Sequence, residues 1–162
     1  MSIIHRKKFI SLAMLGSAGL VFRKEASAQQ QRPDPIDKEM VKEWVSKSHA
    51  DLARVKELFA LQPGLLNASW DWGGGDFETG LEAAGHMGNR EIAQFLLDNG
   101  ARMNIFCAAM LGKIEIVKAT LTAFPQLKTS KGPHGLQLLH HARKGGDQAK
   151  EVLDYLQSIG AA

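Results

Sequence analysis

The residues best suited to chemistry or recognition lie in one glycine-rich stretch, residues 70–78, which reads WDWGGGDFE. Large aromatic side chains such as these are enriched among the residues that dominate protein interfaces. The acids Asp71, Asp76 and Glu78 could offer oxygen ligands to calcium, but their spacing is not that of the D-x-[DN]-x-[DN]-G loop. Three interpretations stay open: partner binding by projecting aromatics, folding of both tryptophans back onto the protein, and a metal site.

Four histidines raise the question of a zinc site: His86, His134 and the adjacent pair His140 and His141. Adjacent residues of a helix point about 100° apart, so the pair cannot easily hold one ion. The chain has no H-x-x-x-H pattern and no second cysteine beside Cys107. The sequence therefore assigns no metal ligand and no cofactor, and we expect the histidines to have structural roles. His134, in a Gly-Pro-His-Gly loop, is the more exposed and a second candidate for recognition.

The sequence contains no arrangement typical of catalysis. The serines Ser46, Ser48 and Ser69 lie in no G-x-S-x-G turn, and no pair of carboxylates indicates acid–base chemistry. The three glycines of residues 73–75 are not followed by a Lys-[ST] pair, as a phosphate-binding loop requires. The single cysteine, Cys107, excludes an intrachain disulfide and is typical of a thiol packed on a short helix. We expect a protein without enzymatic activity.

The N-terminal segment, residues 1–28, differs from the rest of the chain. A basic cluster at residues 6–8 precedes an apolar run at residues 9–22, and Ala-Ser-Ala then ends the segment at residue 28. This order predicts a secretory signal peptide with Gln29 as the first mature residue. The apolar run is shorter than the about 17 residues that span a bilayer, so we expect no stable membrane insertion after cleavage. Residues 5–10 resemble the twin-arginine motif with Lys7 in place of the second arginine, which leaves the export route, Sec or Tat-like, open.

Charge excludes one class of partner. The whole chain has a formal net charge of +3, with 20 basic and 17 acidic residues. Five of the basic residues and one acid, Glu25, fall in the predicted signal peptide, so the mature chain carries a net charge of about −1. Because the basic excess belongs to the predicted signal peptide, the mature chain has no basic surface of the kind that binds nucleic acid. The expected location is periplasmic.

A helix–turn–helix phrase recurs in the rest of the chain and must position these residues. Residues 84–93 read AGHMGNREIA and residues 108–117 read AAMLGKIEIV, so both fit A-[AG]-x-x-G-x-x-E-I-[AV]. This phrase resembles the ankyrin repeat, which has a period of about 33 residues. Gly112 and Gly145 are separated by that period, whereas Gly88 and Gly112 lie clearly closer together in the sequence. The finger between those two repeats is therefore expected to be missing or cut to a tight turn.

Proline, glycine and apolar periodicity set the expected elements. Residues 29–36 should be a flexible lead, and residues 65–78 and 129–135 should form fingers. The expected helices cover residues 38–49, 51–61, 114–124, 136–143 and 147–159. Between them, a short helix should end before Gly88, a second should run to Gly100, and the third repeat should begin at residue 103. The resemblance implies an all-α, ankyrin-like solenoid at residues 37–160, with about four stacked repeats and short or degenerate hairpin fingers. Phe95 and Val117 should face inward.

The resemblance also implies a function. Ankyrin-type proteins recognise other proteins, so we expect a monomer that binds an unidentified protein partner through its concave face and fingers, without catalysis. The residues favoured for that contact are Trp70, Asp71, Trp72, Asp76, Phe77, His86 and His134. The alternative is a small enzyme, or a ligand- or metal-binding protein, with its site at residues 70–78.

Overall fold

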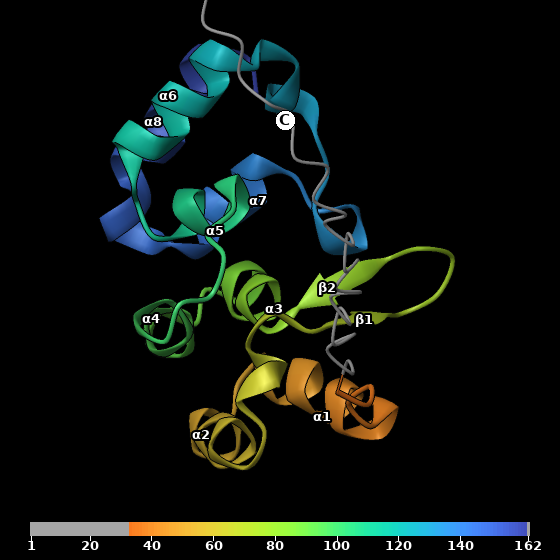
Figure 1. The fold of residues 1–162 in the computed structure, drawn as a ribbon. Helices are drawn as coiled ribbons and strands as arrows, with labels where there is room; N and C mark the ends of the chain where they lie inside the picture. The colour runs from red at the N-terminus through yellow and green to blue at the C-terminus, as the bar shows by residue number, and fades with distance from the viewer. Residues whose placement is uncertain (1–32, 162) are drawn as a thin grey trace, which may run out of the picture. The chain divides into compact units, whose positions relative to one another are not determined.

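Short helices in consecutive pairs make up most of residues 33–161, which the computed structural model describes (Figure 1). The prediction of an all-α fold is confirmed at this level, because the only strands in these residues form one small hairpin. The predicted signal peptide, residues 1–28, and the first part of the predicted lead lie outside the described residues. Within residues 33–161, no helix has the length and apolar character that a membrane crossing requires.

Four helix pairs follow one another. They are α1 (Lys38–Lys47) with α2 (Leu52–Leu61), α3 (Gly80–Met87) with α4 (Arg90–Asp98), α5 (Ile105–Met110) with α6 (Ile114–Ala123), and α7 (Leu138–Lys144) with α8 (Lys150–Ser158). Short 3₁₀ turns lie at Pro63–Asn67, Pro125–Thr129, Pro133–Gly135 and Gly146–Ala149. These bounds agree with the expected helices to within a few residues. The last helix differs most, because its expected first turn at residue 147 is a 3₁₀ turn and the α-helix begins only at Lys150.

Polar side chains at the helix starts explain where the helices begin. The carboxylate of Asp37 accepts a hydrogen bond from the backbone N–H of Met40 and so caps α1. Thr79 and Glu82 form a capping box at the start of α3, each side chain binding the other residue's backbone N–H. At the turn inside the second pair, Gly88 ends α3 with φ +79°, a left-handed conformation that favours glycine.

The helices pack in two rows. The first helices of the pairs contact one another in the order α1, α3, α5, α7, and α3 also packs directly on α7, while α2 lies beside α4 and α6 beside α8. A small residue allows α3 to approach α1 closely: a Cβ added to Gly80, the first residue of α3, would lie 2.7 Å from Oγ of Ser48 and 2.8 Å from Nε1 of Trp44. Val117 is fully buried, and Phe95 is partly buried against Phe59 and the core, so both face inward as expected. Each such apolar side chain contributes about 1.5–3 kcal/mol when fully buried.

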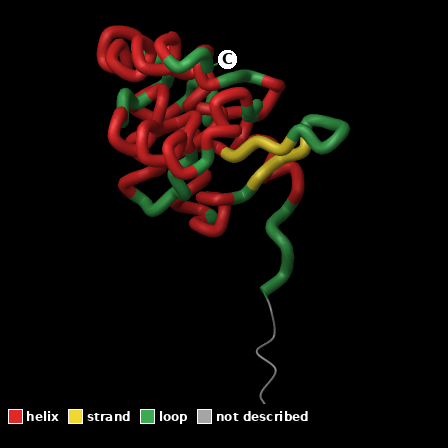
Figure 2. Tube along the Cα trace, turned by 90° about the horizontal axis from the view of Figure 1, so that it is seen from above, coloured by secondary structure: helices red, strands yellow, loops and turns green. Residues whose placement is uncertain are grey.

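One hairpin projects from the helices (Figure 2). Strand β1 (Ser69–Asp71) pairs antiparallel with β2 (Phe77–Thr79), with Trp70 opposite Glu78. At its tip, the carboxylate of Asp71 accepts hydrogen bonds from the backbone N–H groups of Gly73 (2.8 Å) and Gly75 (3.2 Å). The finger expected before Thr79 is thus present, and its tip is closed by its own side chain.

The other two connections between pairs differ in length. Between α4 and α5, residues 99–104 form a turn and an irregular link without a strand, as the short repeat spacing predicted. Between α6 and α7, residues 130–137 form a second, smaller projection, which we call the distal finger. A single β-bridge between Lys131 and Gln137 closes it, and His134 lies at its tip.

Candidate metal centre

Three histidines and a glutamate from four separate segments converge beside the hairpin. His49 follows the end of α1, Glu78 is the central residue of β2, His86 lies in the last turn of α3, and His134 is at the tip of the distal finger. One nitrogen of each imidazole and one carboxylate oxygen all lie within 4.8 Å of one another. We call these four residues the His₃Glu cluster.

The spacing of the four groups is that of metal ligands. The Nε2 atom of His86 lies 2.9 Å from Oε1 of Glu78 and 3.1 Å from Nε2 of His49. The Nε2 atom of His134 lies 3.4 Å from the same Oε1, and Nε2 of His49 lies 3.6 Å from Oε2. A tetrahedral zinc ion with Zn–N distances of about 2.0–2.1 Å holds its ligand atoms about 3.3–3.4 Å apart. The cluster can therefore close around one ion with only small movements.

Glu78 is the least expected member, because its side chain is 0% exposed. Its Oε2 accepts a hydrogen bond of 2.8 Å from the indole N–H of Trp72. Its Oε1 receives no directed hydrogen bond, although Nε2 of His86 is close to it. A buried polar atom without a partner is uncommon in native proteins and is often explained by an ion or a water.

The ionisation of Glu78 suits a ligand. Burial alone would raise the pKa of this carboxyl, but the close imidazole of His86, the hydrogen bond from Trp72 and the nearby ring of His49 outweigh burial and lower the pKa below its ordinary value. The carboxylate is therefore the form present at neutral pH. A buried carboxylate needs a cation or several donors close to it.

Hydrogen bonds on the far side of two rings fix how they point. The Nδ1 atom of His49 lies 3.0 Å from the carbonyl oxygen of Val45 and 3.1 Å from that of Ser46. Carbonyls only accept, so Nδ1 carries the proton and Nε2 presents its lone pair to the cluster. The Nδ1 atom of His134 lies 2.8 Å from Oδ2 of Asp76, which sets the same tautomer. Metal-binding histidines usually donate their second N–H to a carbonyl or carboxylate in this way.

Asp76 holds the distal finger by two bonds. Besides the contact with the imidazole, its Oδ1 accepts a hydrogen bond of 2.8 Å from the backbone N–H of His134. These bonds, the backbone one first, lower the pKa of the Asp76 carboxyl. His134 has φ +58° and is the one non-glycine residue with positive φ among the described residues. Asp76 is thus placed to orient a ligand that stands in an unfavourable backbone conformation.

The remaining residues favoured for partner contact have different surroundings. Trp70 is partly buried against the core, with Lys42 over its ring, so one tryptophan does fold back onto the first helix pair. Trp72 is 38% exposed and binds Glu78, while Phe77 is 59% exposed. His86 is 8% exposed and faces Glu78 rather than solvent.

The adjacent histidines have structural surroundings, in agreement with the sequence interpretation. The ring of His140 lies with Nε2 3.0 Å from the backbone oxygen of His86. His141 is buried against Phe106 and binds the carbonyl of Gln137 through Nδ1. Burial lowers the pKa of His141 to about 4. Neither ring takes part in the His₃Glu cluster.

Sequence reasoning missed the cluster because no two of its members have a short ligand spacing. It named Glu78 only with Asp71 and Asp76 as a weak calcium set and did not single out His49. It considered His86 and His134 for zinc together with His140 and His141, expected structural roles for these histidines, and kept His86 and His134 for recognition. The sequence assigned no metal ligand, whereas the structure brings together four side chains that could hold an ion. The partial signal was the repeat register, which places a helix end, a finger strand and a finger tip on one side of the stack.

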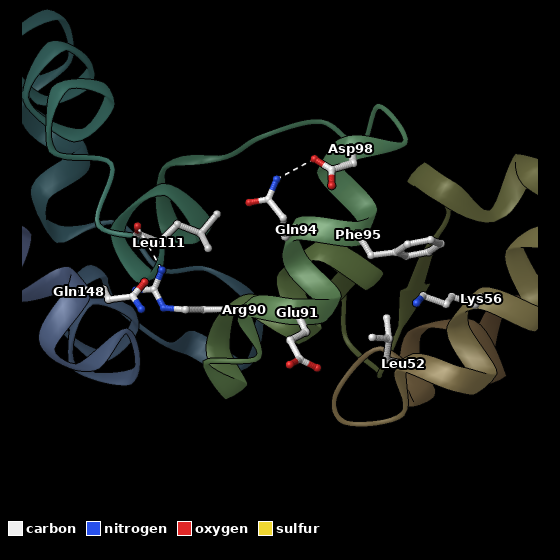
Figure 3. Close-up of a pocket in the computed structure, with 9 residues that line it drawn as sticks. All are labelled: Leu52, Lys56, Arg90, Glu91, Gln94, Phe95, Asp98, Leu111 and Gln148. Atoms are coloured by element: carbon white, nitrogen blue, oxygen red, sulfur yellow. Dashed lines mark hydrogen bonds between the residues drawn. The ribbon is translucent and has the colours of Figure 1, made fainter.

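A separate hollow of about 570 Å³ lies between α2 and α4, away from the cluster (Figure 3). Two of its polar side chains are engaged with the protein: the amide of Gln94 donates to Asp98 (2.7 Å), and Arg90 donates to backbone carbonyls. It shares no residue with the His₃Glu cluster. Its lining therefore presents a partly apolar surface rather than a set of chemical groups.

Comparison with known proteins adds no further ground for a function. No protein-family model matches the chain, and neither the curated proteins nor the solved structures give a match. The resemblance to ankyrin repeats therefore depends on the residues of the recurring phrase. The geometry of the site is therefore the main guide to function.

Proposed function

We propose that this protein binds one divalent transition-metal ion of the zinc class, with His49, Glu78, His86 and His134 as its ligands. The observation that carries the proposal is the fully buried Glu78 carboxylate, whose Oε1 lacks a directed donor while imidazole nitrogens lie around it. Burying a carboxylate is costly unless a cation or strong donors compensate it. One ion among the four groups would satisfy the oxygen and the three nitrogen lone pairs together.

The ligand set selects a class of ion. Imidazole and carboxylate suit zinc, copper(II), nickel and cobalt, whereas calcium and magnesium prefer oxygen ligands alone. No thiolate belongs to the cluster: Cys107 lies elsewhere in the core, and burial raises its pKa to about 12. The neutral thiol of Cys107 and its position argue against a site for copper(I).

The number of ligands supports binding rather than catalysis. Four protein ligands complete a tetrahedral zinc shell, which is typical of structural sites, while catalytic sites keep one position for water or substrate. The indole N–H of Trp72 holds Oε2 of Glu78, which favours coordination through Oε1 alone. The charge also balances, because Glu78 and the adjacent Asp76 together offset the two charges of the ion.

Metal titration of the purified, chelator-treated protein tests the proposal. We expect one zinc or cobalt ion per chain, and for cobalt the intense visible absorption of a tetrahedral site. Glu78→Gln and His86→Ala should weaken zinc binding more than about 100-fold, because losing a ligand costs more than the 10–100-fold loss measured for outer partners. His140→Ala is the matched control, since its ring lies outside the cluster. Absence of stoichiometric binding, or equal binding by Glu78→Gln, would refute the site.

We further propose that the helix pairs form an ankyrin-like solenoid of about four repeats. The recurring phrase of residues 84–93 and 108–117, the two rows of helices and the fingers before α3 and α7 support this interpretation. Stacked repeats bury a continuous core that one pair cannot bury alone.

Protein recognition is a second candidate function, which the exposure of Phe77 on a hairpin with a closed tip favours. An exposed aromatic on a rigid support supplies contact area at small entropy cost. The test is capture of partners from the envelope fraction, where the predicted export would place the protein. A Trp72→Ala/Phe77→Ala variant that folds normally and keeps its partner would remove the hairpin from consideration.

A further inference from the structure

The ligands of the His₃Glu cluster come from helix pairs that lie far apart in the sequence. His49 belongs to the first pair, Glu78 and His86 belong to the second, and His134 belongs to the distal finger that precedes α7 of the fourth. The third pair supplies none. An ion in the cluster would therefore join the β1–β2 hairpin to a finger that follows four α-helices later in the chain, beside the direct contact of α3 with α7.

The short link between α4 and α5 makes this reach possible. A full hairpin at residues 99–104 would project between the β1–β2 hairpin and the distal finger, but these residues form only a turn and an irregular link. The distal finger instead lies beside the hairpin, as its contact with Asp76 shows (Figure 1). The missing finger and the metal cluster are thus two consequences of the same repeat spacing.

Without an ion, the contact that holds the tip of the distal finger is weak. The side chains of Asp76 and His134 are each 32% exposed, so water screens their attraction. The base of the finger is firmer, because Pro133 is buried and Gly132 packs against the ring of Phe106. The base of the distal finger leads into the fourth helix pair, and only the tip of the finger is bound to the β1–β2 hairpin.

On these grounds, and resting on the proposed metal binding, we infer that the ion acts as a latch: when bound, it fastens the distal finger to the β1–β2 hairpin, and when removed, it releases the tip. In a repeat stack, stability comes mostly from contacts between neighbouring units. A metal bond from the hairpin to His134 would strengthen the tip contact with Asp76 and add to the direct contacts of α3 with α7.

The latch controls a surface as well as a connection. A hollow of about 270 Å³ lies between the two fingers, with Gly75, Asp76 and Phe77 on one wall and Lys131, Gly132 and Pro133 on the other. Glu82 and Phe106 line it as well, and its distal wall is the base of the finger, which stays packed against Phe106. Release of the tip would therefore free the side of the hollow next to Asp76, beside the exposed Phe77.

Hydrogen exchange on the whole protein, with zinc and with chelator, tests the latch. The informative amides are those of Gly132, His134 and Gly135, which donate to Leu136, Asp76 and Gly132 respectively. We expect zinc to slow their exchange at least tenfold. His134→Asn is the diagnostic variant, since asparagine tolerates the left-handed conformation and removes the imidazole. Lys131→Ala is the matched control, because its exposed side chain is not a ligand.

The outcomes separate the two proposals. If the wild-type protein binds no zinc, the proposed function and the latch fail together. If it binds zinc and the finger amides exchange as fast as with chelator, the latch is wrong while the metal site stands. If zinc slows them equally in wild type and in His134→Asn, His134 is not the fastening ligand and the latch is again wrong. Slowing in wild type and Lys131→Ala, with loss of slowing in His134→Asn, supports it.

Discussion

Replacing Arg90 by methionine should lower the free energy of unfolding far more than the same exchange at an exposed arginine. Arg90 begins α4 and donates hydrogen bonds to the backbone oxygens of Met110 (2.8 Å), Leu111 (3.3 Å) and Gly145 (2.9 Å). These oxygens lie at the ends of α5 and α7, where the last carbonyls lack partners inside the helix and the helix dipole is negative. Its side chain extends from α4 toward Leu111 and Gln148 (Figure 3). One guanidinium thus joins the second helix pair to the third and the fourth.

The size of the effect follows from the two short bonds. A hydrogen bond to a charged group contributes about 1.5–3 kcal/mol, so two give about 3–6 kcal/mol. Arg90 is half-buried, and water can reach the carbonyls once methionine replaces it, which reduces the expected loss to about 2–4 kcal/mol. For a unit of this size the unfolding temperature should fall by about 8–16 °C, at about 4 °C per kcal/mol.

Urea and thermal unfolding followed by circular dichroism, in the presence of chelator, measure this loss without a contribution from metal. Arg102→Met is the matched control, because Arg102 is exposed and its side chain makes no hydrogen bond within residues 33–161. Its unfolding free energy should change by less than about 0.5 kcal/mol. Arg90→Lys should lie between the two, because an ammonium cannot reach three carbonyls in a plane. An Arg90→Met protein as stable as Arg102→Met would refute the assigned role.

Three other predictions concern a buried ring, a close backbone contact and a metal partner. The pKa of His141 is lowered to about 4 by burial, so the unfolded chain takes up a proton first as the pH falls. The difference in unfolding free energy between wild type and His141→Leu should have its full value above about pH 6.5 and decrease by about 3 kcal/mol toward pH 4. Urea titrations at each pH measure this difference. Gly112→Ala should cost more than about 2 kcal/mol and Gly146→Ala only about 1 kcal/mol, since both have positive φ but only the first would drive a Cβ into a backbone oxygen, that of Gln148; equal losses would contradict the close approach. Trp72→Phe should weaken zinc binding about 10–100-fold, because Glu78 loses the indole N–H, and Trp70→Phe should leave it unchanged in calorimetric titration.

The helices and their ends could be predicted because their causes are local. Asp37 and Thr79 supply a capping oxygen to the following backbone N–H groups, and Gly88 and Gly112 take a left-handed conformation at the tight turns. The short spacing between those two glycines also predicted the missing finger. All of these depend on interactions within a few residues of each other, which a sequence pattern can represent.

The metal cluster could not be predicted in this way because its causes are not local. His49 precedes Glu78 by a whole helix and a strand, and three α-helices separate His86 from His134 in the chain. Their meeting depends on the helix register, on the length of each finger and on the left-handed backbone of His134 together. His134 could be identified as exposed from its Gly-Pro-His-Gly loop, but its direction is set by Asp76 in another finger.

The buried carboxylate decides between two ways of satisfying the cluster. Protons could do it, if the imidazoles around Glu78 were charged, but His49 and His86 stand with their Nε2 atoms 3.1 Å apart, where two positive rings would repel each other. The Nδ1 proton of His49 is already held by backbone carbonyls, so a second proton on its ring would add that repulsion inside a poorly hydrated site. A metal ion places its two charges at one point between the rings and turns the close approach of their nitrogens into coordination. Nitrogen atoms that would repel one another as charged rings can therefore act together as ligands of one ion.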